Sequence, residues 1–142
     1  MEPAGAGIVL DSSVLIAAER RDHTVQKILE RIKAVRGEVD VAASVVTIAE
    51  LMHGAYRSQT QAQRQERLEF IAELSRDVPI HPVTIDVARI AGRIEAEQGL
   101  GGIRISFEDL LIGTTALHLG YEVATLNVRD FERIPGLIVV GI

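Results

Sequence analysis

Apolar residues along this chain follow two alternating patterns, which predict its secondary structure. Short aliphatic runs predict buried strands, and apolar residues at i, i+3, i+4 and i+7 predict helices with one buried face. Strands are expected at 7–10, 39–43, 78–80, 122–125 and 137–140. Helices are expected at 12–20, 24–35, 47–55, 59–74, 87–94 and 106–119.

The alternation of strands and helices predicts an α/β fold. Short, apolar, β-branched strands joined by helices are typical of a mostly parallel central sheet with helices on both faces. The 142 residues show no internal repeat and no linker, so a single domain is expected over 1–142. Such sheets bind ligands beyond the carboxyl ends of their strands.

Polar residues predict where several elements begin or turn. Asp22 is expected to cap the helix 24–35, whose apolar stripe continues to Val35. The segment from Thr47 to Glu50 fits a capping box, in which Thr47 begins a helix and Glu50 hydrogen-bonds back to it. Asp130 fits an ordinary turn residue.

Acidic and amide side chains stand where strands end or helices begin, at four places along the chain. They are Asp11, Glu50, Asp109 and the pair Asn127 and Asp130. Each one alone is explained by a helix cap or a turn. Helix N-termini gather at one edge of a parallel sheet, so the same residues are also placed to form one site. Converging carboxylates repel one another, and a divalent cation relieves that repulsion; hard oxygen ligands favour Mg2+ or Mn2+.

Composition narrows the possible functions. The chain has no cysteine, which excludes thiolate zinc and disulfides and fits a reducing cytoplasm. No apolar run approaches a membrane span. A net charge of −5 argues against coating nucleic acid by bulk attraction, but acidic metal ligands are compatible with a nuclease. Arg20, Arg21 and Arg104 are candidates for contacts with phosphate groups, although each alone is expected to be a solvated surface residue.

Other chemistries lack their residues in this sequence. The turn after the first strand has no glycines, which excludes a dinucleotide-binding fingerprint, and no phosphate-binding loop is present. A receiver domain needs a late lysine, yet the last lysine is Lys33. The four histidines are scattered without metal-ligand spacing, and no nucleophile elbow occurs.

Four segments in order carry a resemblance to a known family. They read Asp-Ser-Ser at 11–13, Ser-x-x-Thr-x-x-Glu-Leu-x-x-Gly at 44–54, Asp-x-x-Ile-Gly-x-x-Ala at 109–116 and Thr-x-Asn-x-x-Asp-Phe at 125–131. In this order and at these distances they resemble PIN-domain ribonucleases of the VapC toxin class. The family has alanine where this chain has Gly113. The resemblance covers nearly the whole chain and implies a PIN-like fold.

The resemblance also implies which residues form the site. Asp11, Glu50 and Asp109 match the three acidic metal ligands. Asn127 stands where many members have aspartate, so it supplies an amide oxygen without charge, and Asp130 is the alternative source of the fourth carboxylate. In addition, the hydroxyls of Ser13 and Thr125 match positions that orient ligands or contact phosphate.

The function implied by the resemblance is a Mg2+-dependent (or Mn2+-dependent) endoribonuclease toxin that cleaves structured RNA such as tRNA or rRNA. The family implies a VapB-like antitoxin that lays a tail over the helices 24–35 and 45–55 and points an arginine at the acidic site. A homodimer or a toxin–antitoxin hetero-oligomer is expected, in the cytoplasm and away from membranes, with promoter DNA contacted only through the antitoxin.

Two alternatives remain open from the sequence. One is a PIN-domain nuclease with a housekeeping role in RNA maturation, which has the same chemistry but no antitoxin. The other is a catalytically inactive scaffold that binds a protein or RNA partner. The uncharged Asn127 is the feature that supports this second alternative.

Overall fold

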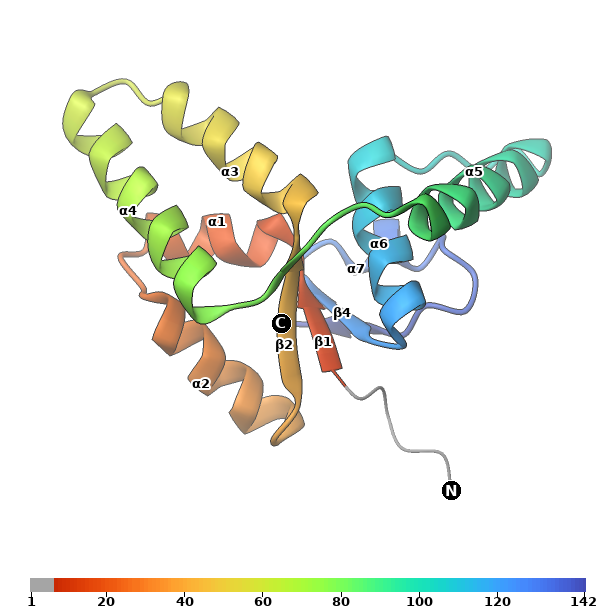
Figure 1. The fold of residues 1–142 in the computed structure, drawn as a ribbon, viewed down its shortest axis with the longest axis horizontal. Helices are drawn as coiled ribbons and strands as arrows, with labels where there is room; N and C mark the ends of the chain where they lie inside the picture. The colour runs from red at the N-terminus through yellow and green to blue at the C-terminus, as the bar shows by residue number, and fades with distance from the viewer. Residues whose placement is uncertain (1–6) are drawn as a thin grey trace.

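A five-stranded sheet forms the centre of the computed structural model, which describes residues 7–142 (Figure 1). The strands are β1 Gly7–Leu10, β2 Asp40–Ser44, β3 Ile80–His81, β4 Glu122–Thr125 and β5 Val139–Gly141. Their order is β3-β2-β1-β4-β5, and every neighbouring pair is parallel. The predicted α/β fold is confirmed, and the sheet is parallel throughout rather than mostly parallel.

Helices cover both faces of the sheet (Figure 1). They are α1 Ser12–Arg20, α2 Val25–Arg36, α3 Val45–Tyr56, α4 Gln61–Asp77, α5 Ile85–Leu100, α6 Phe107–Leu119 and the short α7 Val128–Phe131. Side chains alternate along a strand, so Ile8 and Leu10 face the core beneath α1 to α4, whereas Val9 faces the core beneath α5 to α7. The second helix of the α3–α4 hairpin packs along α3, away from the sheet.

The strand order places a switch point beside β1. The chain moves from β1 to β2 on one side, and β4 returns to the other side of β1. Parallel sheets bind ligands at the carboxyl ends of strands where the order reverses in this way. Leu10 of β1 is in register with Ala124 of β4, and the Asp11 amide donates to the Ala124 carbonyl at 3.0 Å. Asp11 and Thr125 therefore lie side by side at that edge.

The cap predicted for α2 is wrong. Thr24 caps this helix, because its hydroxyl accepts from the Lys27 amide at 3.2 Å. Asp22 instead takes a left-handed conformation with φ 57° in the turn after α1, which short polar side chains tolerate. Val35 is 54% exposed rather than buried. Ten residues at about 100° each turn it about 80° away from the buried Val25, to the edge of the stripe.

The capping box predicted at the start of α3 is also wrong. Ser44 caps α3 with its hydroxyl accepting from the Val46 amide at 3.1 Å, so the helix begins at Val45. Thr47 lies buried inside the helix, and Glu50 is more than a turn from the cap. By contrast, Ser106 caps α6 by accepting from the Asp109 amide at 3.2 Å. The turn expected at Asp130 is the short helix α7.

Candidate active site

Asp11 is fixed at the end of β1 by two hydroxyl groups. It occupies the N-cap position of α1 but makes no capping hydrogen bond. Its Oδ2 atom instead accepts from Ser13 Oγ at 2.6 Å and from Thr125 Oγ1 at 2.9 Å. The side chain is buried. A buried carboxylate with two donors on one oxygen has a fixed orientation, so Asp11 is the most rigid member of the acidic group.

The same two hydroxyls tie α1 to the turn that follows β4. The Leu126 amide donates to Ser13 Oγ at 3.1 Å, and the Asn127 amide donates to Thr125 Oγ1 at 2.9 Å. The two hydroxyl oxygens are 3.3 Å apart. Two backbone amides of the turn after β4 thus hold the hydroxyls that orient Asp11.

Glu50 reaches the acidic group from α3. Burial raises the pKa of its carboxyl group, a hydrogen bond with the Ser12 hydroxyl opposes that rise, and the charges of Asp11, Asp109 and Glu108 add to it. Its Oε1 atom is buried and has no hydrogen-bond partner among the described residues. An unpartnered buried carboxylate oxygen is costly, which indicates that this atom is suited to an absent donor or cation.

Asp109 reaches the group from the first turn of α6. Burial raises its pKa, the Ser106 hydroxyl opposes the rise, and the charges of Asp11, Asp130 and Glu108 add to it. The charge of Asp11 therefore acts on both Glu50 and Asp109. The structure brings these three carboxylates, from three distant segments, to one edge of the sheet.

Asn127 and Asp130 lie at the rim of the group. Asn127 is exposed at the N-cap position of α7, where its side chain makes no capping bond. The Asp130 carboxylate is half-exposed, lies 4.0 Å from the Arg133 guanidinium and also raises the pKa of Asp109. Asp130 thus adds negative charge beside Asp109, whereas Asn127 offers a neutral amide.

The donor set fits a hard divalent cation. Carboxylate oxygens are the ligands that Mg2+ prefers, and Glu50 supplies a buried oxygen without a partner. Within residues 7–142, no three acidic or histidine side chains converge closely enough to form a finished metal shell. Burial is the largest cause of the raised pKa values of Glu50 and Asp109, and the neighbouring carboxylates add to it. A bound cation would relieve the repulsion between those carboxylates.

Sequence reasoning missed two hydroxyl residues of the site. Ser12 hydrogen-bonds the Glu50 carboxyl group, and Ser106 hydrogen-bonds that of Asp109. Ser12 directly follows Asp11 in the sequence, and this position could have identified it as a residue of the site. Of the candidate arginines, Arg20 lines a small cavity of about 50 Å³ beside Glu50, and Arg104 is exposed.

Comparison with known proteins gives a consistent family match. A family model described as the PIN domain matches residues 8–137. Ribonuclease VapC1 of Rickettsia felis is 32% identical over 136 residues, which cover 96% of each chain. Ribonuclease VapC5 of Mycobacterium tuberculosis is 32% identical over 142 residues, 100% of this chain and 98% of the relative. A tRNA(fMet)-specific endonuclease VapC of Salmonella typhimurium is 33% identical over 95 residues, 66% of this chain and 69% of the relative.

Two solved toxin–antitoxin complexes contain a chain with the same fold. DNA-bound VapBC from Salmonella typhimurium superposes with a TM-score of 0.80 at 25% identity, over 95% of this chain and 97% of that one. VapBC-5 from Mycobacterium tuberculosis superposes with a TM-score of 0.73 at 30% identity, over 96% and 98%. The PIN-like fold expected from the sequence is confirmed.

Proposed function

The chain belongs to the PIN-domain family, and on that premise we propose that it is an endoribonuclease toxin neutralised by a VapB-like antitoxin. It hydrolyses RNA phosphodiester bonds, as the relatives named VapC ribonucleases do. The observation that carries the proposal is the acidic group at the switch point, where Ser13 and Thr125 orient Asp11, and Glu50 keeps a buried oxygen without a partner among the described residues. The whole chain, 1–142, acts as one domain.

Metal dependence is part of the proposal. Asp11, Glu50 and Asp109 would hold Mg2+, with Mn2+ as a substitute, and the bound ion supplies an activated water and neutralises the phosphate. Asp130 strengthens the negative field beside Asp109, and Asn127 offers an uncharged oxygen at the rim. Without a cation the carboxylates repel the RNA phosphates, so the empty site disfavours its own substrate.

Ser13 and Thr125 act through Asp11. Their hydroxyls donate to one carboxylate oxygen of Asp11, which fixes the direction in which the carboxylate faces the site. Outer hydrogen-bond partners of this kind set the orientation and affinity of metal ligands. We therefore assign both as positioning residues.

Neutralisation follows from the same acidic group. A carboxylate cluster is a natural partner for a bidentate arginine, so an antitoxin arginine reaching the site replaces the cation. Val35 of α2 and Val45 of α3 are exposed apolar residues on the two helices expected to receive the antitoxin tail. The partners are thus an antitoxin in a hetero-oligomer or on a toxin dimer, and promoter DNA is contacted through the antitoxin because this chain is acidic.

The RNA class and the location complete the proposal. Structured RNA such as tRNA or rRNA is the substrate, in line with the tRNA-specific relative from Salmonella typhimurium. The cytoplasm is the place where that RNA is met. No helix within residues 7–142 has the length and apolar character needed to span a membrane.

Cleavage of total RNA by the purified chain tests the proposal. Discrete fragments are expected with Mg2+ or Mn2+, and none with a chelator. Asp11→Asn and Asp109→Asn should each lower the rate by roughly 100-fold or more, as for removal of a group that stabilises transition-state charge. The matched control is Asp40→Asn, which removes an exposed carboxylate at the amino end of β2. Equal cleavage by Asp11→Asn and the parent chain would refute the site.

The same experiment separates the two alternatives. A folded chain that never cleaves RNA with either metal supports the inactive scaffold, which the neutral Asn127 favours. Metal-dependent cleavage without any short DNA-binding protein encoded next to the gene supports a housekeeping nuclease. Cleavage that stops on adding such a neighbour supports the toxin.

A further inference from the structure

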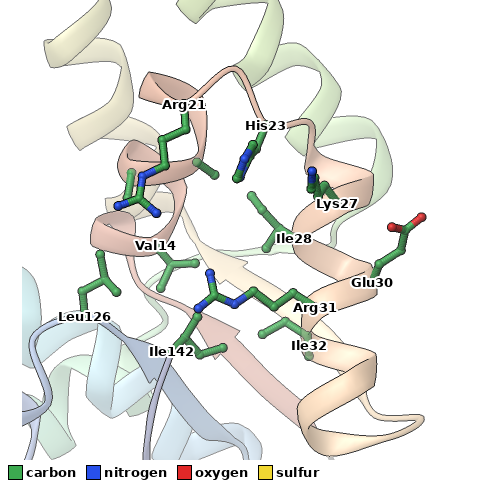
Figure 2. A pocket seen from close by; sticks show the side chains of 12 residues that line it. Val14, Arg21, His23, Lys27, Ile28, Glu30, Arg31, Ile32, Leu126 and Ile142 are labelled. Carbon is green, nitrogen blue, oxygen red and sulfur yellow. The ribbon is translucent and has the colours of Figure 1, made fainter.

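A groove of about 580 Å³ lies between α1 and α2 (Figure 2). Its lining includes Leu126, whose amide donates to Ser13 of the acidic site. Its volume lies within the range of about 300–1,000 Å³ of small-molecule sites. We propose that this groove holds a single-stranded stretch of substrate RNA next to the cleaved phosphate, with Arg21, Lys27 and Arg31 on its phosphates. This inference rests on the proposed ribonuclease function and adds a substrate-binding subsite to it.

The charge of the groove points to an anionic ligand. Arg21, Lys27 and Arg31 line it together with His23, and none of these four takes part in an ion pair found within residues 7–142. Glu30 is the one acidic side chain in the lining, and its carboxylate points away from the groove in Figure 2. In a chain of net charge −5, unpaired cations gathered at one place form a local binding field for phosphates.

The two arginines reach the groove from opposite walls. Arg21 follows the last turn of α1 and Arg31 lies in α2. In Figure 2 the Arg31 side chain extends from α2 into the space beside Ile142, and the Arg21 guanidinium lies in front of α1. Elsewhere arginines are used structurally, for example Arg36 with Glu122 and Arg67 with Glu19. A guanidinium fork binds phosphate bidentately, so two forks in the lining of one groove suit a phosphodiester backbone that passes through it.

The floor of the groove suits bases. It is apolar, with Val14, Ala18, Ile28 and Ile32 among its residues. The His23 imidazole also lines the groove, between α1 and α2 in Figure 2. Single strands are held by cationic grooves combined with surfaces on which unpaired bases pack or stack, including histidine and arginine planes.

Two residues of the groove lining adjoin the acidic site. Leu126 lines the groove, and the Leu126 amide donates to Ser13 Oγ, which in turn donates to Asp11. Val14, the residue after Ser13, lines it as well. An RNA whose phosphate lies at Asp11 therefore enters the groove with its adjoining nucleotides.

An apolar antitoxin segment is the rival occupant. It would cover the floor but would leave the cations of the rim without partners. RNA satisfies both the floor and the rim, so the charges favour it.

The test measures binding of a fluorescein-labelled ten-uridine RNA to the full chain in the Asp11→Asn background, across a range of salt. The variant Arg21→Gln/Arg31→Gln should weaken binding and reduce the slope of log K against log[salt] by about 1.4, since each single-strand phosphate contact contributes about 0.7. Arg21→Lys/Arg31→Lys should keep most of the slope. The control Arg57→Gln/Arg76→Gln removes two exposed arginines of the α3–α4 hairpin and should change neither quantity. Thermal melting checks that every variant folds.

Cleavage in the background with Asp11 intact separates this inference from the proposed function. The groove variant should raise KM for total RNA while kcat changes little, because the groove binds nucleotides that do not react. An unchanged salt slope and KM in a chain that cleaves RNA would overturn the groove and leave the nuclease intact. The same result with loss of binding to the co-expressed antitoxin would assign the groove to the antitoxin. A slope change in a chain that never cleaves would support the groove and refute the nuclease.

Discussion

At the residue scale, the sequence predicted which carboxylates come near one another better than it predicted their hydrogen bonds. Asp11, Glu50 and Asp109 were expected near one edge because each follows a strand or opens a helix, and their charges do act on one another. The prediction that Glu50 takes part in a capping box was wrong, because Ser44 caps α3 and Glu50 lies more than a turn beyond that cap. The bond from Thr125 to Asp11 joins β4 to the end of β1, so local sequence rules could not predict it.

The raised pKa of Asp109 predicts how stability varies with pH. A carboxyl group whose pKa is higher in the folded state binds more protons there than in the unfolded chain, so stability falls as pH rises from about 4 through the folded pKa. The Asp109→Asn variant lacks this carboxyl group and therefore does not lose that part of its stability as pH rises. In chelator the variant should melt above the parent at pH 7, and the gap should close towards pH 4.

Thermal melting from pH 4 to 8 measures this effect. Asp40→Asn is the control and should follow the parent. Added Mg2+ should raise the melting temperature of the parent more than that of Asp109→Asn, because an ion that binds only the folded state stabilises it. An Asp109→Asn variant that melts below the parent at pH 7 in chelator would contradict the repulsion.

At the element scale, helices were predicted more accurately than their ends. The apolar stripes located six helices, yet α2 and α3 begin at other caps than expected, because several polar residues compete for each start. The four-residue helix α7 was taken for a turn, since it is too short to show a period. Gly113 of α6 departs from the alanine of the family pattern, and the structure shows why: Ile134 fills the space.

Gly113→Ala should therefore destabilise α6 packing in a way that depends on Ile134. A Cβ at residue 113 would lie 2.4 Å from Ile134 Cδ1 and 3.2 Å from Leu137 Cδ2. Overpacking lowers the free energy of unfolding by about 1–3 kcal/mol. Replacing a helical glycine with alanine raises it by up to about 1 kcal/mol, because alanine has the higher helix propensity. A net loss of up to about 2 kcal/mol is expected in urea unfolding.

Ile134→Val provides the matched background, because it removes the Cδ1 atom. Alone it should cost about 0.5–1.5 kcal/mol. In that background Gly113→Ala should be neutral or stabilising. An equal cost of Gly113→Ala in both backgrounds, read from the double-mutant cycle, would show that Ile134 is not the obstacle.

At the scale of the whole molecule, the fold class could be predicted but the strand order could not. Alternating strands and helices indicated a parallel sheet covered on both faces. Which strand lies in the middle depends on packing between distant segments, and so does the groove between α1 and α2. The arrangement separates two ends of the sheet: the acidic site lies at the carboxyl ends, and the buried pair of Arg36 and Glu122 lies at the start of β4.

Arg36→Met should weaken the fold and spare the chemistry. Glu122 is 2% exposed, and loss of a partner from a buried acceptor costs about 1–3 kcal/mol. Loss of one member of a fully buried pair costs about 3–5 kcal/mol, but the Arg36 side chain is 28% exposed. Urea unfolding measures the loss. RNA cleavage by the folded variant should match the parent, and a lowered kcat would show that the two ends of the sheet are coupled.

The bond between Asp11 and Thr125 joins residues 114 positions apart, which bears on how the protein is made. Asp11 leaves the ribosome early, but β4 must emerge and pair with β1 before its carboxylate is fixed. A growing chain therefore completes the site around Asp11 only after β4 has been made, and until then it cannot cleave the RNA around it, including that of the ribosome that makes it. We expect ribosome-bound chains arrested before residue 122 to leave that RNA intact in a primer-extension assay.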